Sequence, residues 1–239
     1  NHKLKKITTG QYVRMRSPEN ITAEILELTA TYPEVTDYFL EVETLGADVP
    51  WMEKLCYSLH KINVTRSKKI TFGANLRVYD RMDFEKVFSL MSMAGFTSVT
   101  IGLESGSERI RSEVLNRRYT NETVVQAVKT ARKYHLETGM FNLIGLPGET
   151  RADFLETLKM NQLIQPDWHA TSIFFPYEGT ILYDKARSMN LLPKTLDARN
   201  ERQHAVLDLP GFSKKQIQRE FDRFHFKVYL KNPRKKVIK

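Results

Sequence analysis

The chain has 239 residues, of which 41% are hydrophobic and 10% aromatic, with one cysteine and a formal net charge of +9. This length and composition suffice for one large domain with a substantial core. A single cysteine excludes an internal disulfide bond and indicates a reducing, cytoplasmic setting. No apolar run is long enough to span a membrane, and no stretch resembles a secretory signal. The first residue is Asn1 rather than methionine, so we expect the chain to be part of a longer protein.

The positive charge is concentrated at the two ends of the chain. Residues 1–16 carry five Lys or Arg and no acid, and residues 214–239 carry ten Lys or Arg against Glu220 and Asp222. These ends leave a net charge of −4 for residues 17–213. Domains that bind nucleic acid spread basic residues over a folded face, so we do not expect a nucleic-acid partner. We interpret Pro233-Arg-Lys-Lys236 as a solvated basic tail.

Five predicted strands alternate with helices along the chain. The strands are short apolar runs with β-branched residues, and they lie at residues 37–42, 70–75, 98–103, 138–144 and 169–175. Four predicted helices begin at cap residues, which are Ser17, Thr120, Thr150 and Ser213. Three more cover residues 51–62, 84–94 and 108–115, and a short helix follows Gly179. Ser and Thr at these starts are typical N-cap residues, because the side-chain oxygen accepts a free backbone N–H of the first turn.

This alternation, at about 30 residues per strand and helix, is typical of parallel strands joined by right-handed crossovers. A complete eight-unit barrel needs about 250 residues, so five units predict an α/β fold of the partial TIM-like (β/α) barrel type. The chain opens with a helix, which predicts that the first strand of the barrel is absent from it. We place the partial barrel in residues 1–192 and a C-terminal helical extension with the basic tail in residues 193–239.

Polar groups follow each of the five predicted strands. They are Glu43 with Thr44, Asn75, Glu104 with Ser105, Asn142 with the Gly145–Gly148 turn, and Tyr177 after Pro176. The carboxyl ends of parallel strands meet on one face, where such folds bind ligands. Each group alone is explained as well by turn chemistry, because Asn, Ser and Gly favour turns. Together with Arg117, they predict a binding face for a ligand with hydroxyl, ammonium and carboxylate groups.

Four motifs, in this order, resemble the core of the radical S-adenosylmethionine (SAM) superfamily. They are Ile101-Gly-Leu-Glu-Ser-Gly-Ser107, Val114-Leu-Asn-Arg-Arg-Tyr-Thr120, Phe141-Asn-Leu-Ile-Gly-Leu-Pro-Gly-Glu-Thr150 and Phe175-Pro-Tyr-Glu-Gly-Thr180. The resemblance runs from Asn1 to about Leu192 and is strongest to the cobalamin-dependent branch, in which a separate cobalamin domain precedes the barrel. Asn1-His2-Lys3 and Tyr12-Val-Arg-Met-Arg-Ser17 resemble the segment just after the CxxxCxxC cluster loop of that branch.

The resemblance implies how the amino-acid part of SAM is held. Glu43 and Thr44 match the acid and threonine that hold the SAM amino group. Arg117 matches the arginine that pairs with the SAM carboxylate, a role for which a planar guanidinium is suited. The alternative is that Arg117 and Arg118 are both solvated residues in a link between two helices.

The resemblance also implies contacts to the nucleoside part of SAM. Glu104 matches a polar residue that contacts the ribose, with Ser105 beside it, and Asn142 matches a second ribose contact. The backbone after Gly145 and around Phe175 would flank the adenine. The remaining expected cofactor-binding residues are Asn75, Leu146 and Pro147. No catalytic residue is assigned.

The chemistry of this family requires three cysteine thiolates in a CxxxCxxC loop, which hold a [4Fe-4S] cluster. An electron from the cluster cleaves SAM to a 5′-deoxyadenosyl radical, and the cobalamin-dependent members use it in methyl transfer or rearrangement. Cys56 is the single cysteine and is predicted to be a small core residue within a helix. His2, His135 and His169 show no metal-ligand spacing. We therefore expect no metal ligand in this chain, and we expect the chain alone to be inactive.

Three interpretations follow from these observations. The first is the catalytic barrel of a cobalamin-dependent radical SAM enzyme, whose cluster cysteines lie upstream of Asn1 and whose partners are a small-molecule substrate, an upstream cobalamin domain and an electron donor. The second is a barrel that has lost the cluster and acts as a binding or interaction module. The third is a nucleic-acid-binding domain, against which the acidic residues 17–213 argue. The substrate is not readable, because Leu192–Gly211 carries no recognisable signature.

Overall fold

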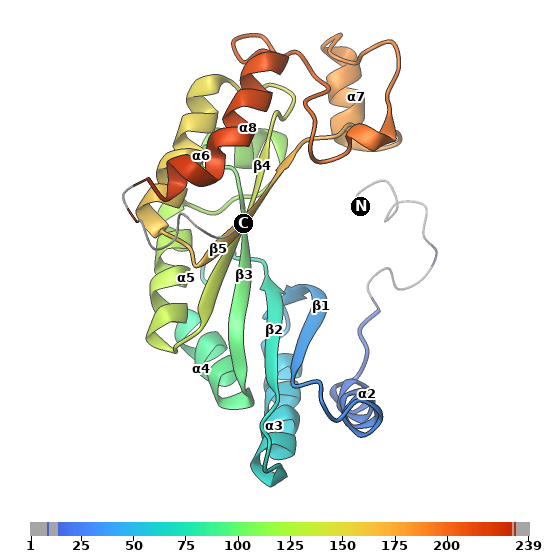
Figure 1. Ribbon diagram of the computed structural model, residues 1–239, viewed down its shortest axis with the longest axis vertical. Helices are drawn as coiled ribbons and strands as arrows, with labels where there is room; N and C mark the ends of the chain where they lie inside the picture. Colours follow the sequence, from blue (N-terminus) through green and yellow to red (C-terminus); the bar gives the residue numbers. More distant parts are fainter. Residues whose placement is uncertain (1–8, 10–13, 231, 233–239) are drawn as a thin grey trace. The chain divides into compact units, whose positions relative to one another are not determined.

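The computed structural model describes residues 9, 14–230 and 232, except the side chains of residues 42–44. Five strands form one sheet in chain order: β1 (Asp37–Leu45), β2 (Thr71–Leu76), β3 (Phe96–Glu104), β4 (Glu137–Ile144) and β5 (Trp168–Ile173) (Figure 1). The helices are α2 (Pro18–Thr31), α3 (Val49–Thr65), α4 (Phe84–Ala94), α5 (Asn121–Lys133), α6 (Arg151–Ile164), α7 (Ile181–Ser188) and α8 (Lys214–Val228). Sequential parallel strands joined by helices confirm the predicted topology of a partial (β/α) barrel with a C-terminal helix.

The chain folds into two compact units. Within the described residues, one unit contains the chain up to Gly102 with Val125–Gly139, and the other contains Leu103–Val124 with the chain from Met140 onward. The expected boundary at residue 192 stays a prediction. The basic tail at 233–236 and the segments 1–3 and 12–13 lie outside the described residues. None of the described helices combines the length and the apolar character needed to cross a membrane.

In the first unit, strands β1, β2 and β3 pair in parallel. Leu45 lies opposite Leu76, which lies opposite Ile101, so the strands are in register at their carboxyl ends. Strand β1 extends to Leu45 rather than ending at the expected Val42, because its last residue still pairs with β2. The fully buried Cys56 lies in α3, which packs between α2 and α4, as predicted for a core residue.

Helix boundaries follow from capping interactions that the sequence indicated. The Ser17 hydroxyl accepts the N–H of Asn20, at 3.1 Å, at the start of α2. Ser213 and Gln216 form a reciprocal capping box at the start of α8. Gly95 ends α4 with φ +97°, a left-handed conformation that glycine adopts without a side-chain clash.

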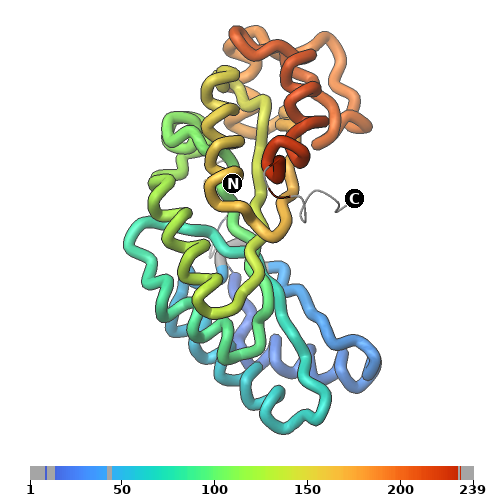
Figure 2. The backbone as a smooth tube through the Cα atoms, turned by 60° about the vertical axis from the view of Figure 1, so that its left-hand side comes forward, coloured from blue at the N-terminus to red at the C-terminus, as the bar shows by residue number. Residues whose placement is uncertain are grey.

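In the second unit, α8 packs along α6 and against β5 (Figure 2). Phe154 of α6 lies between the rings of Phe212 and Phe224, with centroid separations of 5.5 and 5.9 Å. All three rings are fully or almost fully buried. Burying an aromatic side chain of this size stabilises the fold by about 1.5–3 kcal/mol. The C-terminal helix is therefore anchored on the element that follows β4.

The loop after β3 approaches α6 so closely that only glycine fits at position 106. A Cβ added to Gly106 would lie 2.4 Å from the carbonyl oxygen of Glu156 and 2.6 Å from the Cα of Thr157. Both are backbone atoms, which cannot rotate away. Gly106 also donates its N–H to the Thr157 hydroxyl, at 2.8 Å. The end of β3 is thereby pressed against the middle of α6.

We expect Gly106→Ala to lower the free energy of unfolding by about 3 kcal/mol or more, because overpacking against backbone cannot be relieved by a rotamer change. The matched control is Gly179→Ala, since no atom lies within 4 Å of the Cβ added there and φ is +82°. That control should cost only the left-handed backbone term of about 1–2 kcal/mol. Urea denaturation of the three proteins measures both. Equal losses for the two variants would show that α6 yields to the methyl group.

Candidate functional site

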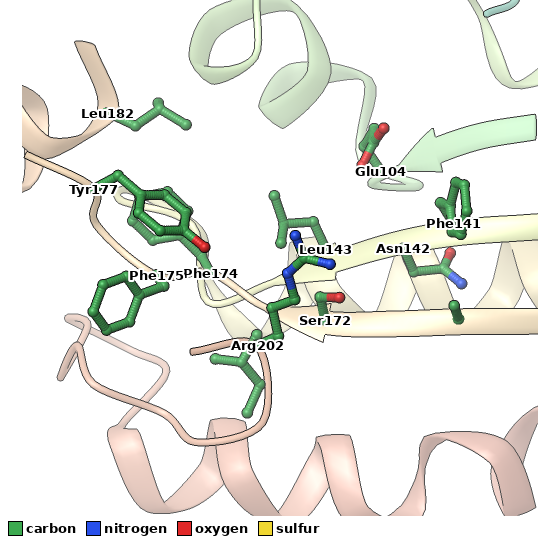
Figure 3. Close-up of a pocket in the computed structure, with 12 residues that line it drawn as sticks. Glu104, Phe141, Asn142, Leu143, Ser172, Phe174, Phe175, Tyr177, Leu182 and Arg202 are labelled. Atoms are coloured by element: carbon green, nitrogen blue, oxygen red, sulfur yellow. The ribbon is translucent and has the colours of Figure 1, made fainter. Parts of the chain in front are cut away.

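A cavity of about 460 Å³ lies among β4, β5 and the segments that follow them (Figure 3). Its volume lies in the range that holds a drug-sized ligand or a cofactor. The wall combines apolar and aromatic side chains with a few polar groups. It is formed by Glu104, Phe141, Asn142, Leu143, Ala170, Ser172, Ile173, Phe174, Phe175, Tyr177, Leu182 and Arg202.

Glu104 and Arg117 form an ion pair beside this cavity, with 3.3 Å between Oε1 and Nη1. Their side chains are only 21% and 27% exposed, so the pair is partly shielded from water. Glu104 ends β3 in a left-handed conformation, φ +60°, which a non-glycine residue rarely adopts and which is often found at functional sites. The neighbouring Arg118 is exposed. Arg117 is therefore not a solvated link residue, and the two expected SAM contacts Glu104 and Arg117 lie together.

The segment between Glu104 and Arg117 is held by the buried Arg111. Its guanidinium donates to the carbonyl oxygens of Ser105, at 2.5 Å, and Tyr119, at 3.0 Å. The Tyr119 ring lies under it, 4.9 Å from the guanidinium carbon, and the Tyr119 hydroxyl donates to the Leu103 carbonyl. Burial lowers the pKa of Arg111. Both ends of the segment are thus held by one cation, which fixes the backbone positions next to Glu104 and Arg117.

The expected helix at residues 108–115 is a short π turn over Ile110–Val114. The Leu115 N–H donates to the Ile110 carbonyl, five residues earlier, at 3.1 Å, and the Arg117 N–H donates to the Arg111 carbonyl at 2.7 Å. A π turn holds one residue more than an α-helical turn and is often found at functional sites. It sets the direction in which the chain leaves toward Arg117.

Ser105 and Ser107 point to α6 and are absent from the cavity wall. The fully buried Ser105 hydroxyl lies 3.3 Å from the Thr157 hydroxyl, and Ser107 donates to Asp153 at 2.7 Å. Arg109 also donates to Asp153, at 2.6 Å. These bonds lower the pKa of the Asp153 carboxyl to about 2, against the opposing effect of burial. The arrangement gives Ser105 a supporting position, and its contact with a ligand stays a prediction.

Asn142 lies on the cavity wall and is 3% exposed. Its Oδ1 accepts the Asn161 amide at 2.8 Å, and its Nδ2 donates to Asn161 Oδ1 at 3.3 Å. Asn161 is anchored in turn on the Thr157 carbonyl. The amide of Asn142 is therefore pre-oriented by α6, as a ligand-contacting group needs to be.

The turn after β4 is built around the buried carboxyl group of Glu149. One of its oxygens accepts the N–H groups of Gly145, at 2.5 Å, and Leu146, at 3.1 Å. The other oxygen has no hydrogen-bond partner among the described residues. Burial raises the pKa of Glu149 to about 8 despite the two backbone donors. Gly145, Leu146 and Pro147 are buried in this turn, and Gly145 adopts φ +79°.

Three expected site residues belong to the other unit. Asn75 lies near the carboxyl end of β2, and its Oδ1 is buried without a hydrogen-bond partner in the described part of the chain. Glu43 and Thr44 lie at the corresponding end of β1, within the strand rather than after it; their side chains are among those not described. Parallel register places these three residues at the same end of two adjacent strands. That they join Glu104 and Asn142 at one ligand stays a prediction.

Phe175 lies on the cavity wall, and it follows β5 rather than ending this strand as the sequence predicted; its contact with the adenine stays a prediction. The strand ends at Ile173, whose N–H donates to the Arg202 carbonyl at 2.8 Å, while the Phe174 N–H donates to Ile144. Pairing partners therefore change at this point and β5 stops. Arg202 is a cavity residue that the sequence did not reveal, because it lies in a segment without periodicity.

The protein is a partial barrel of the (β/α) class, with a ligand-sized cavity at the ends of β4 and β5 and a carboxylate–guanidinium pair beside it. The chain belongs to the radical SAM superfamily, because the sequence profile of that superfamily matches residues 4–160. The match spans more than half of the chain. It confirms the family that the four sequence motifs indicated.

Curated relatives include proteins of two kinds. An uncharacterized methyltransferase of Pyrococcus horikoshii is 32% identical over 151 residues, which are 62% of this chain and 32% of that protein. A tRNA-2-methylthio-N(6)-dimethylallyladenosine synthase of Thermoanaerobacter sp. is 28% identical over 179 residues, which are 70% of this chain and 36% of the synthase. The chain thus spans about a third of the length of these relatives.

Solved structures share the fold at low sequence identity. The radical SAM methyltransferase TsrM of Kitasatospora setae, solved with cobalamin and a [4Fe-4S] cluster, matches with a TM-score of 0.59 at 18% identity, over 68% of this chain and 32% of TsrM. Coproporphyrinogen III oxidase (HemN) of Escherichia coli matches with a TM-score of 0.54 at 15% identity, over 95% of this chain and 61% of HemN. At these identities the likeness shows the fold alone.

We expect Glu149 to make the unfolding free energy depend on pH. Its pKa of about 8 in the folded state lies above the ordinary value of 4.5, so its contribution is full below pH 4.5 and is lost as the pH rises toward 8. Glu149→Gln keeps an oxygen for the two N–H donors and cannot ionise. The variant should therefore gain on the order of 2–4 kcal/mol relative to the parent between about pH 5 and about pH 8.5.

Urea denaturation of parent and variant at each pH gives this difference directly. The titration of His169 does not affect this difference in unfolding free energy, because burial lowers the pKa of His169 to about 4 in both proteins. Glu156→Gln, an exposed position on α6, is the control and should leave the pH dependence unchanged. A constant difference between parent and Glu149→Gln across this range would place the Glu149 pKa near its ordinary value.

Proposed function

We propose that this chain is the SAM-binding part of a cobalamin-dependent radical SAM enzyme, and that it binds SAM at the carboxyl ends of its strands. The observation that carries the proposal is the half-buried Glu104–Arg117 pair beside a cavity lined by Asn142. A carboxylate accepts hydroxyl protons, an amide offers a donor and an acceptor, and a guanidinium pairs with a carboxylate. Ribose and amino-acid groups of SAM supply the matching partners.

Each residue has a defined part in this proposal. Glu104 and Asn142 orient the ribose by accepting hydrogen bonds from its hydroxyl groups, Asn142 with the second lone pair of its amide oxygen, and Arg117 turns from Glu104 to the carboxylate of SAM. Arg117 is 27% exposed and can reorient, whereas Glu104 is fixed by its strand end and Asn142 by Asn161. Phe175 provides apolar surface on the cavity wall for the adenine. The turn at Gly145–Pro147 is buried and absent from that wall, so its contact with the adenine stays a prediction. These residues bind and position SAM, and none is assigned a chemical step.

The residues of this chain do not fit a [4Fe-4S] cluster. Such a cluster needs thiolates, and the one cysteine, Cys56, is fully buried in α3 with a thiol pKa raised by burial to about 12. In the described part of the chain, no group of three His, Cys, Asp or Glu side chains could hold a metal ion. His169 instead packs against Phe224 and Tyr229. Ligands for the cluster would have to come from residues outside this chain.

The reaction that we propose for the whole enzyme is cobalamin-dependent methyl transfer. It is supported by the 32% identical relative named a methyltransferase, and by the fold shared with TsrM and with the cobalamin-dependent enzyme OxsB, whose TM-score is 0.53 at 17% identity. The proposal implies an upstream cobalamin domain, an electron donor and a small-molecule substrate. A tRNA substrate, as named for the synthase relatives, is disfavoured by the net charge of −4 on residues 17–213.

The lone buried cysteine favours a second candidate, a barrel that binds a ligand without a cluster. Iron analysis of the full-length gene product separates the two candidates. About four iron atoms per chain, held by cysteines outside residues 1–239, would support the enzyme. An iron-free full-length protein that still binds a SAM analogue would support the binding module.

We expect Arg117→Ala to weaken binding of S-adenosylhomocysteine by about 2 kcal/mol, roughly 30-fold, because the ligand carboxylate loses a charge-assisted partner. Binding of 5′-methylthioadenosine, which has the same nucleoside but no carboxylate, should not change. Calorimetric titration of the 239-residue chain with both ligands measures the two affinities.

Two further variants complete this experiment. Arg117→Lys should recover part of the loss, since an ammonium group keeps the charge but not the two-pronged contact. Arg118→Ala is the control, because Arg118 is exposed, and should bind like the parent. If Arg117→Ala weakened both ligands equally, Arg117 would act on the fold of the site rather than on the carboxylate. If the parent bound neither ligand, the proposed SAM site would be wrong.

We also expect the purified chain to remain colourless and redox-silent after anaerobic reconstitution with iron and sulfide. One thiol cannot replace three, and Cys56 is protonated inside α3. Absorption and electron paramagnetic resonance spectra check this, with Cys56→Ser as the control that should behave identically. A stable [4Fe-4S] spectrum from the parent would show that other side chains ligate iron.

A further inference from the structure

We propose that Arg202, with the Tyr177 hydroxyl, forms an anion-binding subsite in the cavity, which receives a carboxylate or phosphate group of the substrate. This inference rests on the proposed function only in that it takes the cavity as the place where ligands bind. It names a second ligand group besides SAM. It also names the residue of the C-terminal segment that would select the substrate.

Arg202 reaches the cavity because its backbone pairs with the edge of the sheet. It forms an antiparallel bridge with Ile173, the last residue of β5, and accepts the Ile173 N–H at 2.8 Å. Strand β5 is the last in the sheet order, so this bridge covers its open edge. Arg202 adopts φ +65°, which is costly for a residue with a side chain. The pairing holds this conformation and directs the side chain toward the cavity.

The contacts of the Arg202 guanidinium leave room for a ligand. Its Nε donates to Glu201 Oε1 at 3.0 Å, and the side chain is 73% exposed. A hydrogen bond to the Glu201 carboxylate raises the pKa of the Tyr177 phenol, and the Tyr177 side chain is also hydrogen-bonded to Arg202. An anion would therefore take the place of Glu201 on the Tyr177 hydroxyl. Figure 3 shows the terminal nitrogens of Arg202 in the cavity, with the Tyr177 hydroxyl pointing toward them. Glu201 thus supports the guanidinium from one side, and the terminal nitrogens face the cavity.

Charge is separated across the cavity wall. Arg202 is the basic residue of the wall and Glu104 is the acidic one, and Figure 3 shows them on different sides. The residues beside Arg202 are apolar, with Phe175 and Tyr177 in edge contact at 5.2 Å between ring centroids. An anionic group is therefore attracted to Arg202, where it competes with the Glu201 carboxylate, and is repelled from Glu104. An apolar body that carries a carboxylate or phosphate fits this end of the cavity.

The test uses the 239-residue chain saturated with S-adenosylhomocysteine and titrated with inorganic phosphate or with succinate. The arginine Nε–H signals in nuclear magnetic resonance spectra report binding and identify the residue. We expect at least one of the two anions to shift the Arg202 signal, with an affinity about tenfold weaker in Arg202→Ala, the effect of losing one charged hydrogen-bond partner. A response to phosphate alone would point to a phosphorylated substrate, and a response to succinate alone would point to a carboxylate substrate.

Three further variants make the test specific. Tyr177→Phe removes the hydroxyl without touching the strained backbone of Arg202 and should weaken the anion about threefold. Arg202→Lys should lie between the parent and Arg202→Ala. Arg199→Ala is the control, since Arg199 belongs to the same segment but is 90% exposed and pairs with Asp197; it should bind the anion like the parent.

The outcomes separate this inference from the proposed function. Unchanged anion binding in both Arg202→Ala and Tyr177→Phe, or no anion binding to the parent, would overturn the subsite. A loss of S-adenosylhomocysteine affinity in Arg202→Ala would assign Arg202 to the SAM site and also overturn it. If the parent does not bind S-adenosylhomocysteine, the proposed function fails. Anion titration of the ligand-free chain then still decides about Arg202.

Discussion

The close approach of Gly106 to the backbone of α6 is the constraint on which the site depends. Because no Cβ separates the two segments, the hydroxyl of Thr157 can accept a hydrogen bond from the N–H of Gly106, and the Asp153 carboxylate can accept one from the Ser107 hydroxyl. Helix α6 therefore determines where β3 ends. It also orients Asn142 through Asn161, so one helix face supports polar groups of two neighbouring strands. Replacement of any of these polar pairs by an apolar contact would remove the directionality that hydrogen bonds provide.

A buried cation extends this support beyond α6. Arg111 is fully buried, which is costly unless its donors are satisfied. Carbonyl oxygens of Ser105 and Tyr119 accept two of its donors, and the face of the Tyr119 ring offers negative potential. Its Nε has no partner among the described residues. A buried ion adds little to stability, and the effect of Arg111 is to fix the geometry of the segment after Glu104 through its two carbonyl contacts.

Local patterns explain which parts of the fold and the site were predictable. Strand alternation, the caps at Ser17 and Ser213, and the topology depend on residues close in sequence. Glu104 and Arg117 were predictable as neighbours on one face, because both belong to motifs within one strand-to-helix connection, but their ion pair was not predicted. The orientation of Ser105 toward Thr157 depends on a contact across 52 residues, for which no sequence pattern exists.

The remaining parts of the site were not predictable for related reasons. Arg202 enters the cavity through a single backbone bridge to Ile173 in a segment without periodicity. Glu149 belongs to the motif at residues 141–150, yet its burial follows from the fold of the turn around it. Its hydrogen bond to the backbone of that turn was therefore not predictable from the sequence. Long-range contacts of this kind determine the chemistry of the site while leaving the order of elements unchanged.

The π turn at Ile110–Val114 has a consequence for how the length of this connection can vary. Each residue added to or removed from a helical turn rotates the subsequent residues by about 100° around the helix axis. A single-residue insertion or deletion between Ile110 and Arg117 would therefore swing the guanidinium away from Glu104, even if every remaining side chain were kept. Loops elsewhere on a barrel tolerate changes in length. Here the Glu104–Arg117 ion pair depends on the number of residues in the connection, so proteins that keep this pair should also keep the spacing between the glutamate and the arginine.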